Sequence, residues 1–235
     1  MESVSAATKE KALPTWLPVV TAVMLLVSLY LMFMWVPNER TMGILQRIFY
    51  FHLPSAFTAW VAFYIGGIAA IRYLRNRDNR FDDLSVAANE VGLLFTVVNL
   101  VTGMLWAKPA WGVYWVWDGR LTMQLMLALI YFGYLILRQS VNDPSQRAAV
   151  CAVVSILGMV DIPIVYMANR WWRTQHPGPV MFGGEGSGLD PRMWFVVLFT
   201  FVAMLFLMWC LVRFRRRLER FQREVNGLRQ TIHAL

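Results

Sequence analysis

Residues 193–212, MWFVVLFTFVAMLFLMWCLV, decide the fold, because this stretch of twenty residues contains no charged side chain. A helix needs about 20 mainly apolar residues to cross the hydrocarbon core of a bilayer. Five further apolar runs of similar length occur in the chain. The predicted spans are therefore residues 16–36, 55–74, 86–107, 121–138, 148–168 and 193–212. The sequence therefore predicts an all-α, polytopic membrane protein with six transmembrane helices.

The composition excludes an ordinary soluble domain. Hydrophobic residues make up 58% of the 235-residue chain and charged residues only 15%, whereas soluble chains average about 45–50% and about 25%. The net charge is +8, but membrane proteins are usually basic because of their cytoplasmic loops, so no nucleic-acid partner is indicated and membrane lipid is the expected surrounding. Cys151 and Cys210 both lie in apolar runs, which indicates neither a disulfide framework nor a cysteine metal site.

The chain shows no internal repeat and no linker long enough to separate two domains. We expect residues 1–235 to form a single integral membrane domain. It would carry an outward tryptophan-rich loop at residues 106–122 and a cytoplasmic amphipathic tail at residues 213–235. The longest connection, residues 169–192, is rich in glycine and proline.

The distribution of lysine and arginine predicts the orientation. Fifteen of these residues lie on the side that holds both termini and the second and fourth connections, and seven lie on the other side. Positive charge accumulates in cytoplasmic segments. Both termini are therefore expected in the cytoplasm, and the first, third and fifth connections are expected to face outward.

Two of the three histidines are predicted to face outward. His52 is placed in the first outward connection and His176 in the third, whereas His233 lies in the tail. Imidazole is a common neutral metal ligand, and two histidines can hold a haem iron from both faces. The alternative is that both are loop histidines with ordinary hydrogen bonds.

Tryptophan is distributed unevenly between the two predicted membrane surfaces. An interfacial aromatic belt should occupy both surfaces, yet eight tryptophans lie on the outward side and two near the inner side. A belt therefore explains some of them but not the asymmetry. The outward set is Trp35, Trp106, Trp111, Trp115, Trp117, Trp171, Trp172 and Trp194.

The densest aromatic segment is the outward loop at residues 106–122. Trp111 and Trp115 are one helical turn apart, so a short helix in this loop would place both rings on one face. The result would be a flat aromatic shelf that suits a large planar apolar ligand.

Charged residues near this loop have predicted roles as well. Arg120 and Arg47 could bind ligand carboxylates, because arginine forms bidentate contacts with them. Asp118 is expected to orient the loop, either by capping the next span or by pairing with a neighbouring arginine.

The residues 111–122, WGVYWVWDGRLT, resemble the tryptophan-rich WWD motif of haem-handling proteins in cytochrome c maturation. Three families share that motif: CcmC, CcmF and the CcsA-type synthetases. The length and six spans fit CcmC, since CcmF is much longer and CcsA-type proteins usually have more spans and further histidines. Residues 47–56, RIFYFHLPSA, and 171–176, WWRTQH, also resemble the corresponding CcmC segments.

The resemblance implies a site and a role. His52 and His176 would be the axial ligands of haem b, held as transient cargo rather than for catalysis, so no enzyme activity is expected. The loop would contact the haem and present it to the haem chaperone CcmE. The resemblance also implies work with the CcmA/CcmB ABC transporter and CcmD in the bacterial inner (plasma) membrane. The implied site residues are Arg47, His52, Trp106, Trp111, Gly112, Trp115, Trp117, Asp118, Arg120 and His176.

Three alternatives remain beside this interpretation. A CcsA-like cytochrome c haem lyase or synthetase shares the motif, but more spans or a second pair of outward histidines would favour it. An ABC-transporter permease explains six spans but leaves the histidines and tryptophans unexplained. A b-type electron-transfer cytochrome commonly has its ligands within spans, whereas His52 and His176 are predicted at or beyond span ends.

Two acidic residues lie inside predicted spans. Asp161 is expected to form a helix–helix hydrogen bond near Pro163, with a polar wall below the haem site as the alternative. Glu90 is expected to extend toward Arg72 or Arg75 at the cytoplasmic surface.

The tail carries an apolar repeat with spacings of 3, 4, 3, 4 and 3 residues, an a/d heptad pattern. We expect the sixth span to continue into an amphipathic helix whose apolar stripe docks on a partner, on a second copy or along the membrane surface. The alternative is a short helix with a chance stripe. The residues of the repeat are Leu218, Phe221, Val225, Leu228, Ile232 and Leu235.

Overall fold

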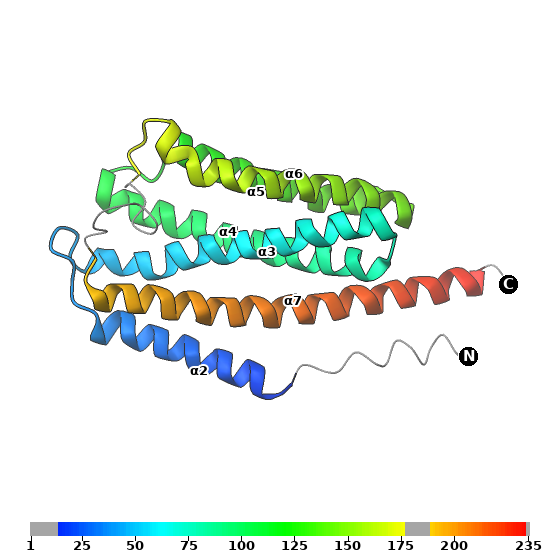
Figure 1. Cartoon of the computed structure of the whole chain (residues 1–235), viewed down its shortest axis with the longest axis horizontal. Helices are drawn as coiled ribbons and strands as arrows, with labels where there is room; N and C mark the ends of the chain where they lie inside the picture. The colour runs from blue at the N-terminus through cyan, green and yellow to red at the C-terminus, as the bar shows by residue number, and fades with distance from the viewer. Residues whose placement is uncertain (1–13, 177–188, 234–235) are drawn as a thin grey trace.

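The computed structural model describes residues 14–176 and 189–233, and its long helices lie side by side in one bundle (Figure 1). In the described residues the structure is helical apart from its connections and one isolated bridge between Glu39 and Gly43. The elements are α2 (Trp16–Tyr30), the π-helical turn η1 (Leu31–Trp35), the 3-10 helix η2 (Ile44–Ile48), α3 (Phe49–Asn76), α4 (Asn79–Trp111), α5 (Gly119–Ser140), α6 (Pro144–Trp171) and α7 (Pro191–His233).

The all-α, six-span prediction is confirmed. Six helical stretches among the described residues are long and apolar enough to cross a membrane. Each coincides with a predicted span: the first, Trp16–Trp35, ends one residue before the predicted end, and the other five extend past the predicted span at both ends. Capping residues set some of the true ends: the Asp78 and Asp143 side chains accept hydrogen bonds from the backbone N–H groups of Arg80 (2.8 Å) and Gln146 (2.6 Å).

The connections define two ends of the bundle. The tryptophan end carries the connections at residues 36–43 and 112–118 and the described parts of the fifth connection, residues 172–176 and 189–190. The basic end carries the short connections at residues 77–78 and 141–143. The eight tryptophans predicted to face outward all lie at or near the tryptophan end, whereas Trp209 lies near the middle of α7. Lys9 and Lys11, which contribute to the predicted orientation, and residues 177–188 of the fifth connection lie outside the described residues.

An aromatic stack lies in the core between α3 and α5. The rings of Phe63 and Tyr131 are parallel, with centroids 3.7 Å apart. Glycines on the neighbouring helices make room for them: a Cβ atom would lie 2.6 Å from Phe63 at Gly92, and 2.6 Å from Tyr131 at Gly158. Real Cβ atoms do not approach so closely, so both glycines are required for α4 and α6 to pack against this stack.

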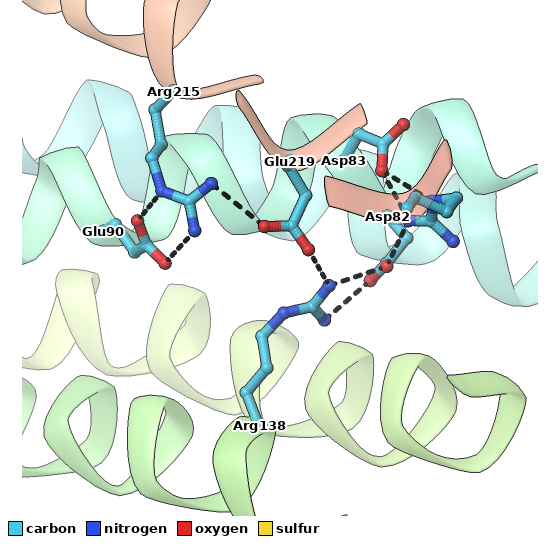
Figure 2. Close-up of polar contacts among 7 residues, drawn as sticks. Asp82, Asp83, Glu90, Arg138, Arg215 and Glu219 are labelled. Atoms are coloured by element: carbon cyan, nitrogen blue, oxygen red, sulfur yellow. Dashed lines mark hydrogen bonds and ion pairs between the residues drawn. The ribbon is translucent and has the colours of Figure 1, made fainter. Parts of the chain in front are cut away.

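At the basic end, an ion-pair network joins α4, α5 and α7 (Figure 2). Arg138 donates to Asp82 at 2.9 Å and to Glu219 at 3.0 Å. Arg223 donates to Asp82 at 3.0 Å and also pairs with Asp83. The network thereby attaches the last third of α7 to the rest of the bundle. Its members are Asp82, Asp83, Glu90, Arg138, Arg215, Glu219 and Arg223.

Both predictions for the acidic residues within spans are corrected. Glu90 pairs with Arg215 of α7 rather than with Arg72 or Arg75, because α7 packs against α4 and supplies a guanidinium there. Within the described residues Asp161 forms no helix–helix hydrogen bond, and its buried Oδ2 atom has no hydrogen-bond partner there.

The prediction that the sixth span continues into the tail is confirmed. Helix α7 runs without interruption from Pro191 to His233, and it extends beyond the other helices at the basic end (Figure 1). The last residue of the predicted stripe, Leu235, lies outside the described residues.

Candidate functional site

His52 lies in the first turn of α3, so the prediction that it belongs to a connection is wrong. The predicted span began at residue 55. The helix begins earlier, at Phe49. The side chains of Phe49 and Tyr50 are buried in a cluster with residues of η1 and α7, and this burial stabilises the additional turn.

The hydrogen bonds of His52 hold its ring against α4 through Nδ1. Its Nδ1 atom lies 3.1 Å from the backbone oxygen of Asn99 and 3.2 Å from the hydroxyl oxygen of Thr102. The Thr102 hydroxyl donates to the backbone oxygen of Val98, and the Asn99 amide donates to the backbone oxygen of His52 at 2.9 Å. The Asn99 amide nitrogen also lies 3.2 Å from Nδ1, so Nδ1 can donate or accept here. In either case Nδ1 is hydrogen-bonded to α4, and Nε2 is the ring nitrogen left for a metal.

The space for the His52 ring depends on Gly103 of α4. A Cβ atom at Gly103 would lie 2.9 Å from His52 Cε1, closer than packed atoms allow. One turn further along α4, the Trp106 ring meets the imidazole edge-on, with centroids 5.8 Å apart. Asn99, Gly103 and Trp106 thus form one face of α4 that holds the imidazole.

His176 lies at the same end of the bundle, in the connection that follows α6. Its backbone N–H donates to the Thr174 hydroxyl oxygen at 3.0 Å, and the Thr174 hydroxyl donates to Oδ2 of Asp118. The charges of His176 and Arg120 act on the His52 imidazole. The fold therefore brings together His52, His176 and Arg120, which are far apart in the sequence.

The prediction that Asp118 caps the following span is confirmed. It is the residue before α5, and its Oδ1 atom accepts the backbone N–H of Leu121 at 2.9 Å. The second carboxylate oxygen holds Thr174. At the next residue, a Cβ atom on Gly119 would lie 3.0 Å from Trp172. The tryptophan-rich loop and the loop that carries His176 are thus packed together at Asp118 and Gly119.

The expected short helix with Trp111 and Trp115 on one face is wrong. Helix α4 ends at Trp111, because Gly112 adopts a left-handed conformation (φ 79°) and its N–H closes the last turn on Lys108 at 2.9 Å. Residues 113–117 are not helical. The ring of Trp115 instead meets that of Trp117 edge-on at 5.6 Å, and the Trp117 side chain is 77% exposed.

An open hollow of about 350 Å³ lies between the two loops. Residues 116–118 of the tryptophan-rich loop line one side, and residues 173–175 line the other. The exposed Trp117 therefore stands at an accessible depression between the two loops.

Neither predicted carboxylate-binding arginine forms an ion pair within the described part of the chain. Arg47 donates to the backbone oxygen of Phe33 at 2.6 Å and to Asn38 Oδ1 at 3.2 Å. The Arg120 guanidinium lies 3.5 Å from the backbone oxygen of Val165. Arg120 lies near His52, whereas the bonds of Arg47 are directed to the end of the first span and the connection after it.

Sequence reasoning missed four residues that position the histidines: Asn99, Thr102, Gly103 and Thr174. One pattern could have revealed the first three. Asn99 is a polar residue inside an apolar span, which suggests a function by default, and Thr102, Gly103 and Trp106 follow it at helical spacing. Thr174 carries no such pattern, because its role depends on where the fifth connection lies relative to α5.

Comparison with known proteins gives a family. Residues 3–231 match the family model described as "CcmC: Heme exporter protein C". Heme exporter protein C of Bradyrhizobium diazoefficiens is 35% identical over 217 residues, which cover 91% of this chain and 81% of that protein. Heme exporter protein C of Escherichia coli is 32% identical over 179 residues, which cover 76% of this chain and 71% of that protein.

A plant relative extends the comparison. The putative cytochrome c biosynthesis ccmC-like mitochondrial protein of Marchantia polymorpha is 32% identical over 180 residues, covering 77% of this chain and 76% of its own. The family match covers the six spans, both histidines and the tryptophan-rich loop. The chain belongs to the CcmC family, the heme exporter protein C family of cytochrome c-type biogenesis.

Proposed function

We propose that this protein takes up haem b at the tryptophan end of the bundle, with His52 and His176 as axial ligands, and passes it to the haem chaperone CcmE. Its relatives are named heme exporter protein C, which supports haem handling in cytochrome c maturation. The haem is cargo in this proposal, and the protein acts as a delivery protein rather than an enzyme.

The observation that carries the proposal is the link from Asp118 through Thr174 to the backbone of His176. This link ties the loop that bears one histidine to the tryptophan-rich loop, at the end of the bundle where the other histidine lies. Arranged so, two imidazoles can approach one iron from opposite faces.

The residues around His52 fit an iron ligand. Nδ1 is hydrogen-bonded to residues of α4, so Nε2 is the nitrogen that would bind iron. Hydrogen bonds to the second nitrogen of a ligating histidine orient the ring and make it more basic. Arg120, near His52, would bind a haem carboxylate, since arginine forms charge-assisted bonds with carboxylates.

Delivery requires an accessible site, and the loops provide one. Trp117 is 77% exposed beside the open hollow between the loops. An exposed aromatic ring can stack on a haem edge or on a partner surface, and neither contact requires the haem to be permanently buried.

We further propose that the tryptophan end faces the periplasm, and that CcmA, CcmB and CcmD assemble with this chain.

The test of ligation is an absorption spectrum of the purified protein and its histidine variants. Wild type should carry b-type haem with a bis-histidine spectrum, and His52→Ala and His176→Ala should each free one axial position and weaken retention. Added imidazole should restore the six-coordinate spectrum. His233→Ala is the matched control, because that residue lies in the tail. A wild-type spectrum in the double variant would show that the ligand assignment is wrong.

The test of delivery uses the loop tryptophans. Trp117→Ala removes an aromatic surface but no iron ligand, so haem binding should largely survive while transfer to CcmE falls. Trp209→Ala, near the middle of α7 and away from the tryptophan-rich loop, should leave both unchanged. Transfer at the wild-type rate in a triple alanine variant of Trp111, Trp115 and Trp117 would count against a delivery role for the loop.

A further inference from the structure

The C-terminal part of α7 has two different faces. One face carries Arg215, Glu219 and Arg223, whose ion pairs with α4 and α5 are drawn in Figure 2. Figure 1 shows that the C-terminal end of α7 extends beyond the other helices. The network therefore fixes the rotation of α7 about its own axis.

The other face of the same helix is apolar, and none of the described residues covers it. Its residues follow the heptad spacing, and Phe221, Leu228 and Ile232 are 64%, 59% and 69% exposed. At about 100° per residue, this stripe lies roughly opposite Glu219 and Arg223. The ion pairs thus turn the stripe away from the protein's own helices. The described stripe is Phe214, Leu218, Phe221, Val225, Leu228 and Ile232.

We propose that this stripe is the contact between two copies of the chain, whose α7 tails pair in parallel. The membrane itself imposes the parallel direction, because two copies inserted with the same orientation project their tails the same way. The tail continues a transmembrane helix without a break, so it points away from the bilayer and its stripe does not lie along the lipid surface.

The residues in the stripe fit a two-stranded pairing. Val225 and Ile232 occupy one set of core positions, the a positions, and Leu228 occupies a d position. β-Branched residues at a, combined with leucine at d, favour parallel dimers over higher oligomers. Leu218 and Phe221 extend the same seam toward the membrane.

The residues flanking the stripe carry complementary charge. Glu224 precedes an a position and Arg229 follows a d position, and both side chains are exposed. In a parallel pair of helices, residue 224 of one helix faces residue 229 of the other helix. Two Glu224–Arg229 ion pairs would therefore form across the contact, one on each side.

A charge-swap experiment with two differently tagged full-length copies tests the proposal. Wild-type copies co-expressed in one membrane should co-purify after solubilisation. Glu224→Arg alone, or Arg229→Glu alone, should reduce recovery of the second copy by about tenfold, because both cross-pairs become repulsive. One copy with Glu224→Arg and the other with Arg229→Glu should restore recovery, since every cross-pair is then attractive.

Matched substitutions separate the stripe from the rest of the tail. Leu228→Asp places a charge in the seam and should abolish co-purification, whereas Asn226→Asp adds the same charge at an exposed position off the stripe and should not. Elution of each variant as a monodisperse species would establish that it folds. The proposal is overturned if wild-type copies do not co-purify, or if the mixed charge-swap pair recovers no more than either single variant.

Discussion

Asp118 accepts a hydrogen bond from the hydroxyl of Thr174, and so joins the tryptophan-rich loop to the loop that carries His176. The same carboxylate caps α5, which anchors it to a rigid element. Thr174 in turn accepts the backbone N–H of His176. The position of one proposed haem ligand is therefore set by an acidic residue of the tryptophan motif.

Thr174→Val should loosen the His176 loop, because valine has the shape of threonine but forms neither hydrogen bond. The bond to a carboxylate contributes about 1.5–3 kcal/mol and the bond to the backbone about 1 kcal/mol. If half of this free energy is lost from the haem-bound state, haem affinity falls about tenfold, as measured by haem titration. Thr174→Ser keeps the hydroxyl and should bind like wild type, and equal affinity in the valine variant would contradict the role of this link.

Gly103→Ala should displace the His52 ring. The new Cβ atom would lie 2.9 Å from Cε1, so the imidazole must move away from its hydrogen-bond partners on α4. We expect weaker haem retention and a changed axial-ligand spectrum. Gly133→Ala in α5 is the matched control, because nothing lies within 4 Å of that position and alanine favours the helix. Identical spectra in both variants would contradict the predicted constraint.

Hydrophobic run length was enough to predict the six spans, since few segments of 20 apolar residues can do anything but cross a membrane. The heptad spacing of apolar residues after the sixth span predicted the continuous tail. The ends of the helices were less predictable. α3 starts before Pro54 because Phe49 and Tyr50 are buried against η1 and α7, and no local pattern reports that tertiary contact.

The candidate site was also only partly predictable from the sequence. The histidines and tryptophans could be chosen from the sequence because their residue types carry the chemistry. The residues that position them could not be chosen from the sequence, because Thr174 and Asp118 are 56 residues apart and come into contact only in the folded protein. The expected helix between Trp111 and Trp115 was wrong because Gly112 ends α4 between them.

The orientation of the bundle is a prediction from charge, and reporter fusions can test it. Fusions after residues 110 and 180 should report outside, and fusions after residues 78 and 142 should report inside. The physical reason is the excess of lysine and arginine on the side of the termini. An inside report at residue 110 would remove the proposed periplasmic haem site.

Asp82→Asn should destabilise the protein while leaving the haem spectrum of any folded fraction unchanged. Asp82 is 4% exposed and accepts hydrogen bonds from both Arg138 and Arg223. Without its charge, the buried Arg138 retains only Glu219 as an acidic partner, and breaking a buried pair by removing one partner costs about 3 kcal/mol. Thermal unfolding of the purified protein should therefore begin at a lower temperature.

Asp143→Asn is the control for that substitution. It makes the same chemical change at an exposed cap at the same end of the bundle, where asparagine caps a helix as well as aspartate. Replacing both partners, as Asp82→Leu with Arg138→Met, should cost less than Asp82→Asn alone, because no buried charge is then left without its partner. Equal unfolding temperatures for Asp82→Asn and Asp143→Asn would mean that the network contributes no net stability. In that case the ion pairs would serve only to fix the rotation of α7.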